Sequence, residues 1–198
     1  GSHRVDQNTD ILIDIALDAA RQAGAETEVI ELAECNIEFC AGCNRCLFKP
    51  ECSIKDDDMR VIKEKMLAAD GILIASPNYF SNVTARMKNF FDRTRPLHMT
   101  SNQLKGKVAG FLTMGGLDNT GSETTNAIME NFCATHEMLI VHARPEGPVL
   151  GSGVRGSLLD RVEDGIPHWR RSVKDDPIAP LIAAQLGKDM VELIKRLS

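Results

Sequence analysis

Hydrophobic and polar positions along the chain follow two periods, one helical and one extended. Apolar residues recur at helical spacing from Ile11 to Ala23, and we expect this helix to end at Gly24. Two continuous apolar runs, 71–76 and 107–114, are typical of parallel strands that are buried on both faces. Further strands are expected at 27–32 and 138–141, and further helices after residue 58, after residue 84, at 123–137 and at 178–197.

This alternation predicts an α/β fold, in which a doubly wound parallel sheet carries helices on both faces. We expect one domain that spans residues 1–198. Residues 144–176 break the pattern with glycines, prolines and charges, and they contain the only tryptophan, Trp169. We expect an irregular insertion there that packs at a subunit interface or over a ligand.

Composition and charge narrow the classes of partner. The chain has 23 basic and 28 acidic residues, a net charge of −5, which disfavours nucleic acid or an anionic membrane as the main partner. It shows no signal peptide and no long apolar run, so we expect a cytoplasmic protein with no membrane contact.

Four of the six cysteines form a compact tetrad, comprising Cys40, Cys43, Cys46 and Cys52. Thiolates separated by two residues can turn inward on one loop, and a fourth can complete the coordination of a metal centre. Three closely spaced cysteines plus a fourth favour an iron-sulfur cluster over structural zinc. Structural zinc is usually bound by two CxxC-type cysteine pairs that a longer spacer separates. Reduced thiols without metal are the other alternative, and a disulfide ranks below all three. Cys35 and Cys133 lie among apolar residues and are expected to be small buried hydrophobes.

Three polar loops lie where strands end or helices begin, which is where open α/β sheets bind ligands. Residues 1–9 offer hydroxyl, amide and guanidinium groups to a phosphate, although Asn8 or Thr9 could instead only cap the helix. The loop 77–84 holds the only tyrosine, which could stack on a planar ligand or simply cover the core. The glycines at 115–116 permit close backbone approach to a ligand.

These segments resemble those of the flavodoxin-like NAD(P)H-dependent FMN reductases, and the tetrad resembles that of the iron-sulfur flavoproteins within that group. Residues 1–9 are similar to the family's GSxRxxxNT phosphate loop, 76–93 to its SPxYFGxxSAxxKxFxDR stretch, and 121–125 to its glycine-glutamate loop. Two departures stand in the second stretch, because Ser81 replaces a usual glycine and Asn78 a usual apolar residue.

The resemblance implies a five-stranded sheet in the order 2-1-3-4-5, in which a strand precedes the phosphate loop. The printed sequence begins at that loop, so its first strand is missing. Either the native chain extends upstream or the first element is built in another way. We also expect the tetrad, which follows the strand predicted at 27–32, to lie on the same edge of the sheet as the three loops.

The resemblance further implies that the loops bind FMN. The phosphate would be held by Ser2, Arg4, Asn8 and Thr9. The ribityl chain and the flavin ring would be surrounded by Pro77, Asn78, Tyr79, Phe80, Ser81, Asn82, Thr113, Met114, Gly115 and Gly116. The tetrad would ligate a 4Fe-4S cluster that exchanges electrons with FMN. No acid-base residue is assigned, and His98 and His136 are expected to be solvent-facing or satisfied within the core.

The function that follows is an FMN-dependent oxidoreductase that passes electrons between a reduced donor, the cluster, FMN and a small acceptor. The donor would be a ferredoxin-like protein or NAD(P)H, and the assembly a homodimer or homotetramer whose subunits complete each other's sites. Two alternatives remain open. One is an NAD(P)H-dependent FMN or quinone reductase with empty thiols, and the other is a non-enzymatic flavin- or zinc-binding module.

Overall fold

The computed structural model describes residues 1–118, 120–143, 145 and 153–198, so residues 144 and 146–152 of the expected insertion lie outside it. The described helices are α1 (Asn8–Gln22), α2 (Met59–Ala68), α3 (Ala85–Arg93), α4 (Ser122–Thr135) and α5 (Ala179–Leu197), with short 3-10 turns η1 (Arg45–Leu47), η2 (Arg95–Leu97) and η3 (Val173–Asp175). The described strands are β1 (Gly71–Pro77), β2 (Val108–Gly115), β3 (Leu139–Ile140), β4 (Val154–Ser157), β5 (Leu159–Glu163) and β6 (Ile166–Trp169).

The main sheet is parallel and is built around β2. One edge of β2 pairs with β1 along seven residues. The first two residues of β2 also pair with β3, and its last four pair with β4, so β3 and β4 act as two halves of one interrupted strand. Part of the segment that we expected to be an irregular insertion therefore belongs to the sheet. It does so because β2 offers the unpaired backbone groups that a strand needs.

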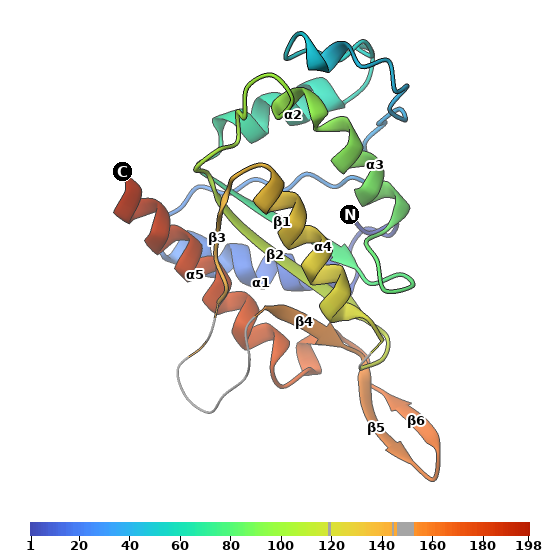
Figure 1. Ribbon diagram of the computed structural model, residues 1–198. Coiled ribbons are helices and arrows are strands. Elements are labelled where there is room, and N and C mark those ends of the chain that lie inside the picture. Colours follow the sequence, from blue (N-terminus) through green and yellow to red (C-terminus); the bar gives the residue numbers. More distant parts are fainter. Residues whose placement is uncertain (119, 144, 146–152) are drawn as a thin grey trace.

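Helices cover both faces of this sheet, as the alternation predicted (Figure 1). Side chains of alternate residues point to opposite faces. Ile74 and Phe111 pack with α2, α3 and α4, whereas Ala75 and Leu112 pack with α1 and α5. The second layer is tight, because a side-chain carbon on Gly187 of α5 would lie 1.9 Å from the carbonyl oxygen of Ala16. The doubly wound α/β fold is confirmed.

The strand predicted at 27–32 is wrong, because these residues pair with no other strand within the described part of the chain. Their sequence favours an extended backbone, but a strand also needs a neighbour for its amide and carbonyl groups. In the order 2-1-3-4-5 that neighbour is the first strand, and none of the described strands takes that place.

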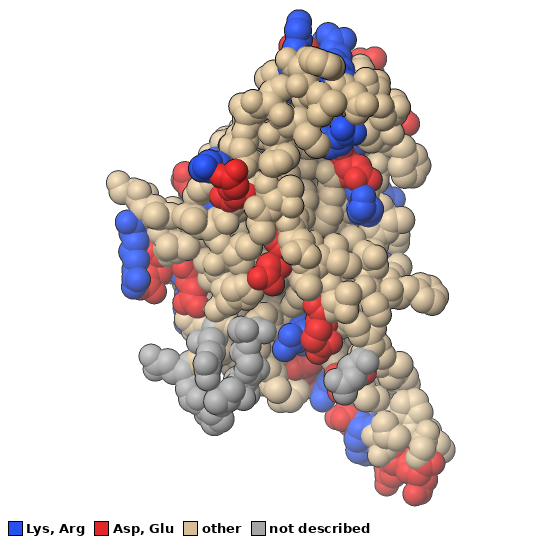
Figure 2. Space-filling model, viewed as in Figure 1, with Lys and Arg blue, Asp and Glu red and all other residues tan. Residues whose placement is uncertain are grey.

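A two-stranded antiparallel hairpin, β5 and β6, projects from the body of the molecule (Figure 1). It lies within the segment where we predicted an insertion, and Trp169 at its end is half exposed. Lysines, arginines and acidic residues are interspersed over the face shown in Figure 2 and form no large patch of one sign. None of the described helices is both long and apolar enough to span a membrane.

Candidate functional site

A tight turn follows β1. The backbone groups of Tyr79 and Asn82 exchange hydrogen bonds of 2.9 and 3.1 Å across it. The two residues at its tip, Phe80 and Ser81, are both left-handed, with φ values of 52° and 58°. Glycine or asparagine usually occupies such positions, and a bulky residue there stores about 1–3 kcal/mol of strain. This geometry explains why a glycine is usual where Ser81 stands, and the strain marks the turn as a functional candidate.

Asn78 connects this turn to the loop after β2. Its side-chain nitrogen donates to the carbonyl of Thr120 at 2.9 Å, and its side-chain oxygen accepts from the hydroxyl of Thr125 at 2.9 Å. Its backbone nitrogen donates to the carbonyl of Met114 at 2.8 Å. An apolar residue could not make the two side-chain bonds, which gives the departure at Asn78 a structural role.

Gly121 lets the two loops touch, and our sequence reasoning did not assign it to the site. Its φ of 97° is left-handed, and a side-chain carbon there would lie 2.1 Å from the hydroxyl oxygen of Ser81. The only signal in the sequence was its place in the glycine-glutamate loop. The candidate flavin residues 77–82 and 113–116 are therefore brought together by hydrogen bonds and by this close approach.

The N-terminal loop packs against the same region. The hydroxyl of Thr84, the N-cap of α3, donates to the carbonyl of Gly1 at 2.6 Å. Ser2 and Thr9 are buried, Arg4 is exposed, and the ring of His3 lies 6.0 Å from that of Tyr79. The structure therefore places this loop beside the Tyr79 turn.

The alternative that Asn8 or Thr9 only caps α1 can now be judged. The N-cap is Gln7, which forms a capping box with Asp10. The side-chain oxygen of Asn8 accepts from the backbone nitrogen of Val173 at 2.9 Å, so this oxygen holds η3 against the loop. Neither Asn8 nor Thr9 is needed as a cap. The side-chain nitrogen of Asn8 stays available to a ligand in this arrangement.

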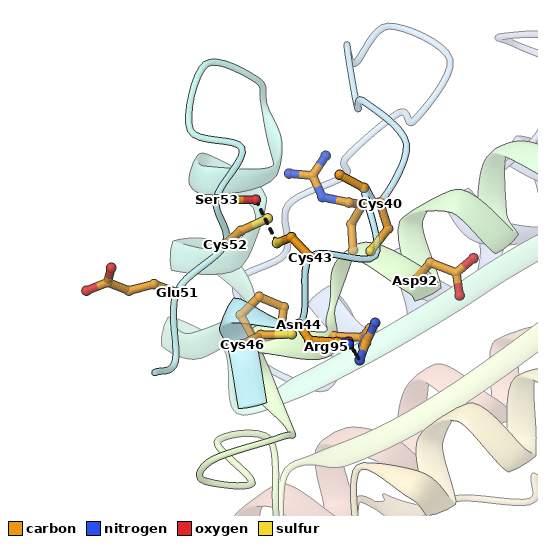
Figure 3. Close-up of a pocket in the computed structure, with 12 residues that line it drawn as sticks. Cys40, Cys43, Asn44, Cys46, Glu51, Cys52, Ser53, Asp92 and Arg95 are labelled. Atoms are coloured by element: carbon orange, nitrogen blue, oxygen red, sulfur yellow. Dashed lines mark hydrogen bonds between the residues drawn. The ribbon is translucent and has the colours of Figure 1, made fainter. Parts of the chain in front are cut away.

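All four cysteines of the tetrad line one small cavity of about 20 Å³, together with Arg93 and Arg95 (Figure 3). Cys46 is buried, Cys40 and Cys43 are exposed, and the structure contains all of them as free thiols. The Cys43 sulfur lies 3.1 Å from the hydroxyl of Ser53, and hydrogen bonding by Ser53 and by the backbone of Arg45 lowers the pKa of Cys43.

This donor set fits an iron-sulfur cluster in chemistry, since four thiols face one space. Their arrangement is not yet that of a metal centre. Within the described residues no three His, Cys, Asp or Glu side chains stand close enough to hold a metal ion. A cavity of this volume holds about one water molecule. The cysteine loop would therefore have to rearrange to place the four thiols around a cluster.

A buried ion pair fastens the cysteine loop to α3, and sequence reasoning missed it. The guanidinium of Arg93 donates to both carboxylate oxygens of Asp57 and, at 2.6 Å, to the carbonyl of Glu38. Asp57 also accepts from the backbone nitrogens of Glu38 and Met59 at 3.0 and 3.2 Å. The segments on both sides of the cysteine loop, at Glu38 and at Asp57, are thus held by one ion pair. Its two side chains are each 1% exposed. The bond to the backbone nitrogen of Met59 also places an Asp57 oxygen at the start of α2.

Burial disfavours the charged forms of Asp57 and Arg93, but the attraction between the two charges is the larger effect. For Asp57, burial raises the pKa while hydrogen bonds from Arg93 and the Glu38 amide lower it, and the net pKa falls below the ordinary value. For Arg93, burial lowers the pKa while its bonds to Asp57 and its proximity to Cys52 raise it, and the net pKa is raised. The pair therefore stays charged at neutral pH.

The two candidate sites lie at opposite ends of α3. The flavin turn precedes its first residues, whereas Asp92 and Arg93 at its other end line the cysteine cavity (Figure 1). Nine helical residues span about 13 Å. Our expectation that both sites share one edge of the sheet is wrong for a single copy of the chain, because it rested on the unpaired segment 27–32.

Comparison with known protein families shows to which family a chain with these loops belongs. Residues 1–144 match the NADPH-dependent FMN reductase family. The chain belongs to this family. Members bind FMN and transfer electrons through it, so the chain is a flavin-dependent oxidoreductase with FMN as its cofactor.

Two kinds of name occur among the relatives of this FMN reductase family member. An iron-sulfur flavoprotein of Methanocaldococcus jannaschii is 38% identical over 98% of this chain and 94% of its own length. One of Archaeoglobus fulgidus is 36% identical over 94% of this chain and 89% of its own length. A protein of Archaeoglobus fulgidus named NAD(P)H dehydrogenase (quinone) is 27% identical, over 98% of this chain and 95% of its own length.

Solved structures agree on the fold. RosB with a bound flavin-type intermediate superposes with a TM-score of 0.70 at 19% identity, and covers all of this chain and 76% of its own. A flavodoxin from Archaea superposes with a TM-score of 0.56 at 13% identity, over 97% of this chain and 94% of its own. The fold is flavodoxin-like.

Proposed function

We propose that this FMN reductase family member is an iron-sulfur flavoprotein, which passes electrons between a reduced donor, a 4Fe-4S cluster, FMN and a small acceptor. The donor would be a ferredoxin-like protein or NAD(P)H. One observation carries the proposal: four thiols face one cavity on a loop that a buried ion pair fastens to α3. Relatives that are 33–38% identical and named iron-sulfur flavoproteins support it.

The three loops would contact different parts of FMN. Ser2, Arg4 and Thr9 stand at the start of α1, where the helix dipole and unpaired amides favour a phosphate. Tyr79 and Phe80 offer exposed aromatic surface to a planar ring. Bound FMN supplies both hydride and single-electron chemistry. The side chains named here position it and exclude water, and none is needed as a nucleophile.

The tetrad would hold the cluster, which carries one electron at a time. Cys40, Cys43, Cys46 and Cys52 supply the four sulfur ligands that such a cluster requires. Arg93 and Arg95 lie in the wall of the same cavity and place positive charge beside thiolates.

A second copy of the chain would bring a cluster close to a flavin. Within one copy the two sites are separated by the length of α3, and the cysteine loop exposes Phe39 and Phe48 by 78% and 83%. Large exposed apolar side chains beside a site favour burial against a partner. We therefore infer a homodimer or homotetramer in which the cysteine loop of one copy faces the flavin turn of another.

Anaerobic reconstitution with iron and sulfide tests the cluster directly. We expect about four iron and four sulfide ions per chain, as the cluster formula states. A Cys43→Ala/Cys46→Ala double variant should lose them, while Cys35→Ala, outside the tetrad, should retain them. If the wild-type protein gains no more iron than the double variant, the cluster assignment fails.

A cluster-free NAD(P)H-dependent FMN or quinone reductase is the second candidate. Two observations favour it: no metal-binding group is formed among the described residues, and one relative is named NAD(P)H dehydrogenase (quinone). Stopped-flow reduction of bound FMN separates the candidates. Rapid bleaching by NADPH or NADH in the double variant, at the wild-type rate, would favour this second function over the first.

A further inference from the structure

The strained turn after β1 is held from outside by the side chain of Asn78. Phe80 and Ser81 at its tip both have a positive φ, which glycine adopts without strain and other residues do not. The backbone hydrogen bonds between Tyr79 and Asn82 close the turn, but they do not relieve this strain. A turn of this kind persists only where its surroundings stabilise it.

Asn78 supplies such stabilisation through both ends of its amide. Its nitrogen donates to the carbonyl of Thr120, and its oxygen accepts from the hydroxyl of Thr125, each at 2.9 Å. The carbonyl of Thr120 can only accept, so it determines which end of the amide is the nitrogen. Thr125 is fully buried near the start of α4, and this burial gives the amide a fixed anchor.

Ser81 contacts the same anchor less favourably. Its hydroxyl donates to the carbonyl of Thr120 at 3.3 Å, which is longer than the bond from Asn78. Asn78 and Ser81 are also the two positions at which the chain departs from the stretch that it resembles. Their effects on the turn are opposite, because a serine with a positive φ adds strain and the two bonds of the asparagine amide oppose it.

The shape of the turn matters for FMN because the turn carries the exposed aromatic surface of the candidate site. Tyr79 and Phe80 both extend from it into solvent. Relaxation of the left-handed residues to an ordinary backbone conformation would move both rings. A protein that adopts its binding form for only a fraction of the time binds its ligand more weakly by that fraction.

We propose that Asn78 is a positioning residue for the flavin ring of FMN. Its amide holds the turn in the form that presents Tyr79 and Phe80, and its two bonds offset the strain that Ser81 adds. Because these bonds lie within the protein, they favour this form before FMN binds as well as afterwards. The inference rests on the assignment of the flavin ring to this turn, but not on the iron-sulfur cluster.

Four chains test the proposal: the wild type, Asn78→Leu, Ser81→Gly and the double variant. Leucine branches at the same carbon as asparagine but cannot form the two bonds. Stopped-flow fluorescence gives the rate constants for association and dissociation of FMN and of riboflavin, and circular dichroism shows whether each variant is folded. Thr135→Val is the matched control, because the Thr135 hydroxyl also bonds a backbone carbonyl, that of Asn131, but at the other end of α4.

Each of the two bonds is worth about twofold to twelvefold in an equilibrium constant. We expect Asn78→Leu to slow the association of both FMN and riboflavin by about five- to tenfold, because the binding form is less populated, and to leave dissociation unchanged. Ser81→Gly removes the strain, so the double variant should associate within about twofold of the wild-type rate. Thr135→Val should change neither rate constant.

Unchanged association in Asn78→Leu would overturn the proposal. So would faster dissociation at an unchanged association rate, because that result would show a direct contact between Asn78 and the flavin. If Ser81→Gly does not restore association in the double variant, the amide does not offset strain at Ser81 and the proposal also fails.

A second variant covers the case in which Asn78→Leu does not fold. Thr125→Val removes one of the same two bonds and keeps the shape of the side chain, so it should slow association by about two- to fivefold. Association at the wild-type rate in folded Thr125→Val would then overturn the proposal. Wild-type protein that binds neither FMN nor riboflavin would instead refute the flavin site itself.

Discussion

The ion pair between Arg93 and Asp57 predicts a large loss of stability when its negative partner is neutralised. Asp57→Asn keeps the shape of the side chain and removes its charge, which leaves the Arg93 guanidinium buried without a counter-ion. Breaking a buried pair in this way costs about 3–5 kcal/mol. For a chain of this length, each kcal/mol lowers the melting temperature by about 2–4 °C. We therefore expect a fall of about 6–20 °C in the metal-free protein.

Urea unfolding at neutral pH measures this loss, and Asp18→Asn is the matched control. Asp18 also pairs with an arginine, Arg21, but both side chains are about half exposed or more. Removing such a surface pair costs at most about 1 kcal/mol. If Asp57→Asn is no more destabilising than Asp18→Asn, then Arg93 is solvated in solution and the pair does not hold the cysteine loop.

The pH dependence of the same variant gives a second measurement. The pKa of Asp57 is lower in the folded protein than its ordinary value of 3.8, so the unfolded state takes up the proton first as the pH falls. The contribution of Asp57 is fully present above the ordinary pKa and is lost as the pH falls through the folded pKa. The stability difference between wild type and Asp57→Asn should be constant from about pH 7 to pH 5 and shrink below about pH 4. A constant difference at every pH would show that its origin is not the charge of Asp57.

Three further predictions concern the flavin site and assembly. Gly121→Ala should displace the turn at Ser81 and weaken FMN by about 1–3 kcal/mol in a fluorescence titration, whereas Gly165→Ala, which has a positive φ but open space around it, should leave FMN affinity unchanged. Arg4→Ala should weaken the binding of FMN by about 1.5–3 kcal/mol. The binding of riboflavin, which lacks the phosphate, should stay unaltered. If the variant binds FMN as tightly as the wild-type protein, the N-terminal loop is not part of the site. Trp169 should be buried at a subunit contact or over the flavin, so a monodisperse monomer whose tryptophan emission does not respond to FMN would contradict both placements.

The local sequence was enough to predict those elements whose formation does not depend on one particular neighbouring strand. The apolar run at 71–76 indicated a strand covered on both faces, since so many consecutive apolar side chains leave no face for water. The helical spacing from Ile11 onward predicted α1 for the same kind of reason. The tetrad and the three loops also stood out, because thiols at short spacing and polar residues after buried runs have few structural explanations.

Strand pairing and long-range contacts were decided only by the tertiary structure. Residues 27–32 have the composition of a strand and lack a partner, whereas Val154–Ser157 lie in a glycine-rich, charged segment and pair because β2 has a free edge beside them. Pairing depends on a neighbour that local composition does not reveal. Arg93 and Asp57 are 36 residues apart, and nothing in either local sequence indicates the other. The separation of the cysteine cavity from the flavin turn likewise follows from where the loop docks on α3, which only the folded chain decides.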